Sequence, residues 1–303
     1  MDLLATSEYT KVPENERRMV MPSAKQRVID FRLRPPEDEF KEEFPVESVV
    51  GNLRALGYKP APSFMKRSKS LLLKEMDAVG VEVGVMNGIH WNDIHVTDDQ
   101  VENVQKRYGG RMVSLACPNL KKPIKEVVRE IETSIVQRGF KGVAIESFHV
   151  SMQVDDKRLF PIYEKCLDLG VFVHLMSGPI ISMPNLSFTD PIHYEYVALK
   201  YPDLKIAIFH ACYPYVYQAC ALMLRSARHG VANIHLEPDA FIFAPGGSVY
   251  VEAMKAYPDN FLFASAYPYG VIKESVKQVN KLPLDRKLRS KYLYENALKL
   301  LKL

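Results

Sequence analysis

The feature that most constrains the fold is a short apolar run that ends in a histidine. Within residues 201–215, a Tyr-Pro-Asp turn precedes Ile206–Phe209, and His210 follows directly. A strand with no polar residue on either face is buried on both sides, as in parallel sheets covered by helices. In parallel barrels the carboxyl ends of the strands carry the chemistry. The run therefore predicts a parallel α/β fold with His210 at its functional edge.

The same layout of helix and strand recurs along the chain. Alternation at this spacing favours a parallel sheet with right-handed crossovers, and eight units favour closure into a barrel. A doubly wound open sheet is the alternative, but no glycine-rich phosphate loop follows the first strand. The fold prediction is a (β/α)8 TIM barrel with an N-terminal arm and a long insertion after strand 1. The predicted strands are 27–33, 81–86, 112–116, 140–145, 171–175, 205–209, 231–236 and 261–264, and the predicted helices are 68–78, 98–108, 122–138, 155–169, 191–200, 215–228 and 248–256, with two short helices at the end.

The length of 303 residues fits one such barrel of roughly 250 residues with additions. Residues 1–26 are polar and aperiodic, and we interpret them as an arm that is either disordered or an oligomer contact. The barrel domain is predicted to cover 27–303. Within it, residues 37–67 are charged, rich in proline and long for a connection, so they are predicted to form a lid or a substrate wall.

Composition argues against several classes of partner. The chain is 47% hydrophobic and 25% charged, which is typical of soluble proteins, and its net charge is only +4. The basic residues form no cluster with aromatic residues, so nucleic acid is not an expected partner. No apolar segment resembles a signal peptide or a membrane span. The four cysteines form no CxxC pair, as expected of free thiols in a reducing cytoplasm, and we predict a cytoplasmic location.

Polar residues gather at the predicted strand ends. Five of the eight histidines lie there, whereas random placement would put most on helices and loops. This enrichment predicts a polar pocket at the carboxyl ends of the strands. The residues at or just after these ends are Arg32, Arg34, Asn87, His90, Trp91, Cys117, Asn119, Glu146, His149, His174, His210, His235, Glu237, Ser265 and Tyr267.

Several segments resemble the amidohydrolase-related family of TIM barrels, which contains aminocarboxymuconate-semialdehyde decarboxylase-like enzymes and metal-dependent hydrolases. The resemblance covers about 27–303 and is specific to the family rather than to one substrate. Its main parts are FKGVAIESF (140–148), DDKRLFPIYEKCLDLGVFVHLMSG (155–178), YPDLKIAIFHACYPY (201–215), FLFASAYP (261–268) and ENALKLLKL (295–303).

The resemblance implies a divalent metal held by His-x-His at strand one, a histidine at strand five and an aspartate at strand eight, with a further histidine at strand six. His174 and His210 match the two single histidines. Arg32 and Arg34 stand in the His-x-His positions, and Ala266 stands where the family has aspartate. A guanidinium group has no lone pair to give to a metal. We therefore predict no metal, no other cofactor and no standard metal-dependent hydrolysis.

The predicted function is a metal-independent hydrolase or decarboxylase that acts on a small anionic molecule. Paired arginines suit a carboxylate or phosphate, and two histidines suit acid–base catalysis near neutral pH. The alternative for the same residues is a buried ion network of Arg32 and Arg34 with Glu146 and Glu237, in which His174 and His210 hydrogen-bond to each other. The predicted catalytic residues are His174, His210 and Glu146, and the predicted substrate-binding residues are Arg32, Arg34, His235, Glu237, Tyr213 and Tyr267.

Two further functions stay open from the sequence. The chain could be a non-catalytic subunit that pairs with a metal-bearing relative. It could also be a metal hydrolase with a rearranged ligand set of His174, His210 and Glu237. The resemblance implies a homo-oligomer, and the non-catalytic alternative implies a hetero-oligomer with a related barrel.

Overall fold

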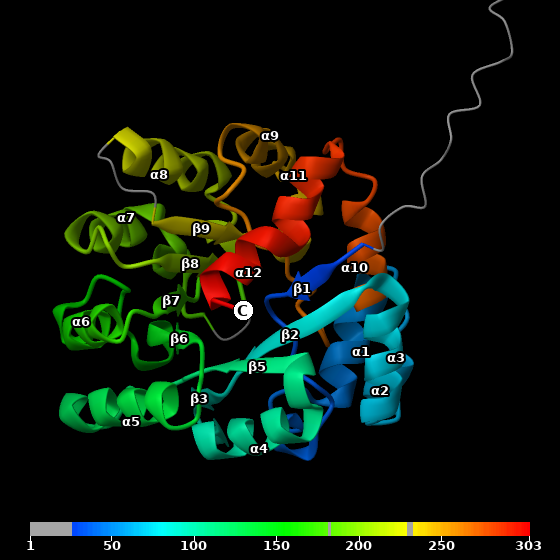
Figure 1. Cartoon of the computed structure of the whole chain (residues 1–303), viewed down its shortest axis with the longest axis horizontal. Helices are drawn as coiled ribbons and strands as arrows, with labels where there is room; N and C mark the ends of the chain where they lie inside the picture. The colour runs from blue at the N-terminus through cyan, green and yellow to red at the C-terminus, as the bar shows by residue number, and fades with distance from the viewer. Residues whose placement is uncertain (1–25, 181–182, 229–232) are drawn as a thin grey trace, which may run out of the picture.

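The computed structural model describes residues 26–180, 183–228 and 233–303 (Figure 1). The predicted arm, except Gln26, lies outside the described residues. Parallel strands follow one another around a ring in the order β1-β2-β5 and then β6-β7-β8-β9. The strands are β1 Val28–Asp30, β2 Val81–Asn87, β5 Met112–Leu115, β6 Gly142–Ile145, β7 Phe172–Leu175, β8 Ile206–Phe209 and β9 Ile234–Glu237.

The ring closes at two joints. Between β5 and β6, Ala116 bridges Val143 in parallel. Residues 261–264 take the eighth place without forming a regular strand. On one side the Leu262 amide donates to the Leu236 carbonyl at 2.9 Å, and on the other the Phe31 amide donates to the Phe263 carbonyl at 2.9 Å. The predicted (β/α)8 TIM barrel is confirmed.

Helices surround the ring, and local signals explain where they begin. Ser68 accepts a hydrogen bond from the Leu71 amide, and Thr97 and Gln100 form a capping box. The chain end is more divided than predicted, because three α-helices and a π-helical turn at Lys291–Glu295 replace two helices. The other helices are α3 Lys69–Val79, α4 Asp98–Tyr108, α5 Ile124–Val136, α6 Phe160–Asp168, α7 Pro191–Lys200, α8 Val216–Arg228, α9 Ser248–Ala256, α10 Ile272–Val279, α11 Arg286–Ser290 and α12 Asn296–Leu301.

The barrel is apolar at one end and charged at the other. At the amino end of the strands, Phe172 and Ala207 pack with Leu300 and Leu301 of α12. Figure 1 shows α12 lying across this end of the ring. Apolar packing therefore fills the lower half of the barrel, as in other parallel barrels, and leaves the carboxyl ends for polar residues. None of the described helices is both long and apolar enough to cross a membrane.

The insertion at 37–67 is a helical layer rather than an open loop. It contains a short 3-10 helix at Asp38–Phe40, α1 Val46–Ala55 and α2 Pro62–Met65. Phe40, Val49, Leu53 and Phe64 are buried and join the main core. This apolar packing explains why a segment rich in charge and proline is ordered here.

A hairpin that the periodicity did not predict follows β2. Strands β3 Ile89–Trp91 and β4 Ile94–Val96 pair antiparallel. The two strands are only three residues each, too short for an alternating pattern to be recognised in the sequence. Because β2 ends at Asn87, the hairpin stands at the carboxyl end of the barrel.

The Ser63 hydroxyl fastens the insertion to the barrel. It lies 2.8 Å from the Tyr267 hydroxyl and donates to the Glu75 carboxylate of α3. We expect Ser63→Ala to destabilise the protein by about 1 to 3 kcal/mol, because it leaves Glu75 and Tyr267 without this partner. Urea denaturation measures the loss. The exposed Ser70→Ala is the control and should stay within about 0.5 kcal/mol of the wild type; equal effects of the two variants would contradict the assignment.

Candidate active site

A cluster of buried and half-buried ionisable side chains fills the carboxyl end of the barrel. Its members come from β1, β6, β7, β8 and β9 and from the insertion, so residues distant in sequence share one desolvated site. The cluster consists of Asp30, Arg32, Arg34, Glu43, Glu146, His174, His210, Glu237 and Asp239.

His210 lies between a cation and an anion. Its Nε2 is 2.7 Å from Nη1 of Arg32, and its Nδ1 is 2.5 Å from Oδ2 of Asp239. Guanidinium nitrogens only donate, so Nε2 is the accepting nitrogen and Nδ1 carries the proton that faces Asp239. The Arg32 guanidinium also lies over the Phe209 ring, 4.8 Å from its centre. The ring of His210 is thus fixed in one tautomer.

The backbone at His210 adopts a conformation that is uncommon for residues other than glycine. His210, Ala211 and Cys212 have φ values of 52°, 46° and 59°, all in the left-handed region. Each costs roughly 1 kcal/mol or more, and such strain concentrates at functional sites. Gly178 makes room for this turn, since a Cβ there would lie 2.4 Å from the His210 Cβ.

His174 and Glu237 form a buried pair. The His174 Nε2 and the Glu237 Oε2 are 2.8 Å apart, and neither side chain is exposed. Burial, followed by the charge of Arg32, holds the pKa of His174 well below its usual range. Burial, followed by the charge of Asp239, holds the pKa of Glu237 well above its usual range. Both shifts favour the uncharged forms, an imidazole beside a protonated carboxyl group.

The hypothesis that His174 and His210 hydrogen-bond to each other is wrong. Each ring instead faces a carboxyl group from the end of β9 or the turn after it, Glu237 for His174 and Asp239 for His210. The reason is that β9 delivers two acidic residues two positions apart. Asp239 was missed from the sequence, although its spacing from Glu237 is a visible signal.

Arg34 lies between two carboxylates without hydrogen-bonding to either. Its Nε is 3.8 Å from Oε1 of Glu43, and its Nη2 is 3.8 Å from Oε1 of Glu146. Both nitrogens are buried and find no hydrogen-bond acceptor among the described residues. Of the predicted ion network of Arg32 and Arg34 with Glu146 and Glu237, only part is therefore present. Arg34 faces Glu146, whereas Glu237 pairs with His174.

Asp30 is a further member that sequence reasoning missed. It is fully buried, and its Oδ1 accepts hydrogen bonds from the amides of Ser265 at 2.9 Å and Arg32 at 3.3 Å. Burial raises the pKa of Asp30 to about 7. A carboxylate between the apolar residues Ile29 and Phe31 of the predicted strand was the available signal.

Three other predicted site residues lie around the cluster or away from it. Tyr213 stacks on Phe241 with ring centres 4.5 Å apart, and Phe241 meets the His210 ring edge-on. Tyr267 turns outward to Ser63. His235 is influenced by Lys205 and Lys299, and burial lowers its pKa to about 4. The structure thus brings Tyr213 close to the cluster, but not Tyr267 or His235.

The insertion closes the entrance to the cluster. Beside Arg34, residues including Phe40, Phe44 and Pro268 leave a cavity of about 10 Å³, room for about one water molecule. A larger cavity of about 290 Å³ lies near Arg27 and Glu82 at the amino ends of the strands, so it does not serve the cluster. A ligand can reach Arg34 only if the insertion moves.

The residues present do not fit the metal site that the resemblance implies. Arg32 and Arg34 offer no lone pairs, and Ala266 offers no side-chain oxygen. In the alternative set of His174, His210 and Glu237, the Nε2 of His210 already faces Arg32. Across the described ranges, no group of three or more His, Cys, Asp or Glu side chains is arranged to hold a metal ion.

The amidohydrolase family model matches residues 70–303 of this sequence. The chain belongs to the amidohydrolase family. Membership of this family supports an enzyme of the hydrolase or carboxy-lyase class, as predicted. A search of curated proteins found no match.

Several solved structures have the same fold. An uncharacterized TIM-barrel protein from Bordetella bronchiseptica is 30% identical, with a TM-score of 0.84 over 91% of this chain and 98% of its own. A 5-carboxyvanillate decarboxylase from Novosphingobium aromaticivorans, complexed with manganese, is 16% identical, with a TM-score of 0.65 over 92% and 96%. A 2,6-dihydroxybenzoate decarboxylase from Rhizobium is 15% identical, with a TM-score of 0.66 over 91% and 99%.

The stability of this amidohydrolase-family protein should depend on the charge of Asp30. Its pKa rises from 3.8 to about 7 on folding, so the stabilisation it gives is complete below pH 3.8 and is lost as the pH rises through 7. Asp30→Asn should therefore be more stable than the wild type at pH 8 by roughly 2 to 4 kcal/mol, and the difference should shrink toward pH 4. Thermal or chemical unfolding at both pH values tests this. The exposed Asp203→Asn is the control, and a difference that does not change with pH would contradict the interpretation.

Proposed function

We propose that this protein is a metal-independent decarboxylase of small carboxylated molecules, in which Arg32 and Arg34 take the place of the metal. The observation that carries the proposal is the Nε–Nη2 edge of Arg34. This edge is buried and lacks hydrogen-bond acceptors among the described residues. Such an edge matches the two oxygens of a carboxylate, and charge-assisted pairs of this kind are among the strongest hydrogen bonds in proteins.

A buried acid supplies the proton that decarboxylation requires. Decarboxylation breaks the bond between a carbon and its carboxylate, releases CO₂ and leaves an electron pair on that carbon, which must take up a proton. Glu237 can give this proton, because burial raises its pKa and so favours its protonated form. Its carboxylate then regains a proton from solvent. His174, at 2.8 Å, orients the carboxyl group.

The structural neighbours favour an aromatic carboxylate as the substrate class. Two of them are named for decarboxylation of 5-carboxyvanillate and 2,6-dihydroxybenzoate. The Phe209 ring is already covered by Arg32 and by the stacked His174 ring, so a flat substrate would pack against His210, whose Nε2 faces Arg32, and the neighbouring Phe241. The proposal therefore includes a planar acid, bound by its carboxylate to the arginines.

Glu43 is the group that a substrate must displace. It belongs to the insertion, and its carboxylate faces the same edge of Arg34. A substrate carboxylate would take its place once the insertion moves. Glu43 thus acts as an internal competitor in the closed state.

A non-catalytic subunit is the second candidate, and the closed entrance favours it. A charged cluster with room for only about one water molecule could serve solely to fill a former metal site. Under that function the chain would pair with a metal-bearing relative. A homo-oligomer remains our prediction for the enzyme.

Arg34→Lys distinguishes the decarboxylase from the non-catalytic subunit, because it keeps the positive charge and removes the paired guanidinium nitrogens that would bind a carboxylate. We expect a loss of roughly tenfold or more in affinity for carboxylates such as 2,6-dihydroxybenzoate, corresponding to 1.5–3 kcal/mol per charge-assisted bond. Calorimetry measures binding, and CO₂ release from chelator-treated protein measures turnover. Arg158→Lys, an exposed arginine paired with Asp156, is the control.

Turnover that appears only after a divalent metal is added would overturn metal independence. If no planar carboxylate binds the wild type and Arg34→Lys lowers only the stability, the non-catalytic subunit is the better description.

Glu43→Gln should strengthen carboxylate binding severalfold at pH 8. Burial raises the pKa of Glu43 to about 7, so the competitor is charged above pH 7 and largely neutral below it. The gain should therefore shrink at pH 6. Binding titrations at both pH values measure it. The exposed Glu42→Gln is the control, and weaker binding by Glu43→Gln at both pH values would contradict the competitor role.

A further inference from the structure

The β3–β4 hairpin places two histidines face to face. His90 and His95 are directly opposite in the antiparallel register. Their Nδ1 atoms are 3.1 Å apart, and their ring centres are 5.3 Å apart. If both Nδ1 atoms carried a lone pair, or if both carried a proton, they would repel each other at this distance. Something must therefore lie between the two rings, either a shared proton or a bound cation.

The separation suits a metal ion. Zinc binds imidazole nitrogen at 2.0–2.1 Å with tetrahedral angles, which places two nitrogens about 3.3 Å apart. Small side-chain rotations within the hairpin cover the difference from 3.1 Å.

A second layer of contacts holds the His90 ring in place. The ring hydrogen-bonds to the backbone carbonyl of Cys117. The Cys117 amide in turn donates to Asp98 at 3.0 Å, and Ser134 donates to the same carboxylate at 2.6 Å. Ligand histidines in metal sites have such a carbonyl partner on the second ring nitrogen, which fixes the tautomer.

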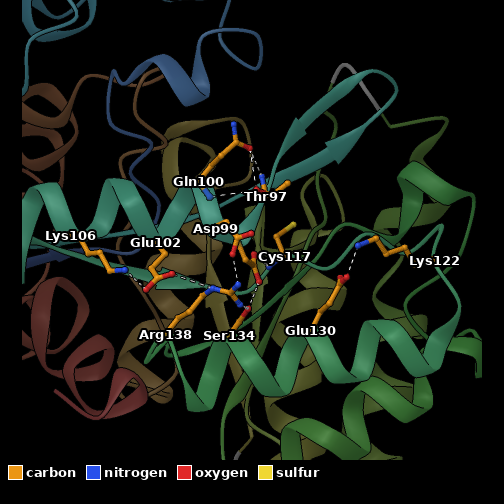
Figure 2. A network of polar contacts seen from close by, with 11 residues as sticks. Thr97, Asp99, Gln100, Glu102, Lys106, Cys117, Lys122, Glu130, Ser134 and Arg138 are labelled. Atoms are coloured by element: carbon orange, nitrogen blue, oxygen red, sulfur yellow. Dashed lines mark hydrogen bonds and ion pairs between the residues drawn. The ribbon is translucent and has the colours of Figure 1, made fainter.

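The base of the hairpin is equally well fixed. Thr97 follows β4 directly and forms the capping box of α4 with Gln100. Figure 2 shows the Thr97–Gln100 cap beside the contacts of Cys117 and Ser134, with the Lys122–Glu130 pair nearby. The hairpin strands are therefore anchored by polar contacts rather than by the pair of rings alone.

We propose that His90 and His95 together bind one divalent transition-metal ion, and that this ion is zinc. Within the described ranges no third His, Cys, Asp or Glu completes the site, so water fills the other positions. Imidazole ligands select zinc, nickel and copper, whereas magnesium and calcium prefer oxygen. The proposal does not depend on the function proposed for the arginine cluster.

The site has a structural connection to that cluster. Trp91 lies between the two histidines in sequence, and its ring stacks on His149 with centres 5.6 Å apart. The Nδ1 of His149 is 3.4 Å from Oε2 of Glu146. A cation on the hairpin would thus hold the wall beside Glu146 in place.

Trp91 provides a direct readout, because it is the only tryptophan in the chain. The experiment titrates the untagged full-length protein with Zn²⁺ by calorimetry and with Ni²⁺, a fluorescence quencher, by following Trp91. We expect one Zn²⁺ per chain, saturable quenching by Ni²⁺ and no response to Mg²⁺. His95→Phe keeps the ring and removes the nitrogen, and it should weaken both metals at least about tenfold. His95→Asn gives the same test if His95→Phe does not fold.

His193→Phe is the matched control, since His193 is a surface histidine paired with Asp155 at 2.9 Å and lies elsewhere on the barrel. It should bind both metals as the wild type does. Zinc binding that is absent in the wild type, or unchanged in His95→Phe and His90→Phe, would overturn the proposal and leave the pair as an N–H···N hydrogen bond.

Discussion

Two guanidinium groups at the carboxyl end of the barrel, Arg34 buried and Arg32 half-buried, are the constraint on which the rest of the site depends. Arg32 and Arg34 bring positive charge into a region that also contains five carboxyl groups, Asp30, Glu43, Glu146, Glu237 and Asp239. Two opposing effects act on those groups, since burial favours the protonated form and the arginines favour the ionised form. For Glu43 and Glu237 burial is the larger effect, and their pKa values rise in spite of the nearby cations. The cluster is therefore poised to exchange protons near neutral pH.

This balance is coupled to the insertion. Glu43 reaches the cluster from the insertion, and Ser63 of the same segment contacts Tyr267 after the eighth strand position. Phe44 also packs edge-on against Tyr269, with ring centres 5.6 Å apart. Movement of the insertion would expose Arg34 to water and remove one carboxylate from it at the same time. Access to the site and its protonation thus change together.

In the proposed function, an arginine takes the position of a metal ligand and changes the chemistry that the barrel can perform. A metal ion polarises water to make a nucleophile, whereas a guanidinium group can only donate hydrogen bonds and supply fixed charge. Binding of an anion and proton transfer by a neighbouring acid are what remain. Decarboxylation needs just these two, and this is why we propose it for the arginine cluster rather than hydrolysis of a neutral bond.

The sequence by itself determined the barrel, because its apolar strands and amphipathic helices alternate with a period that local residue types set. It also placed Arg32, Arg34, His174 and His210 at the strand ends. Only the tertiary structure decided the partners of these residues, since each contact joins side chains from different strands. The pairing of His174 with Glu237, the approach of Glu43 to Arg34, the burial of Asp30 and the contact of His90 with His95 all depend on register, strand curvature and the docking of the insertion. These are long-range packing outcomes, which no short sequence pattern encodes.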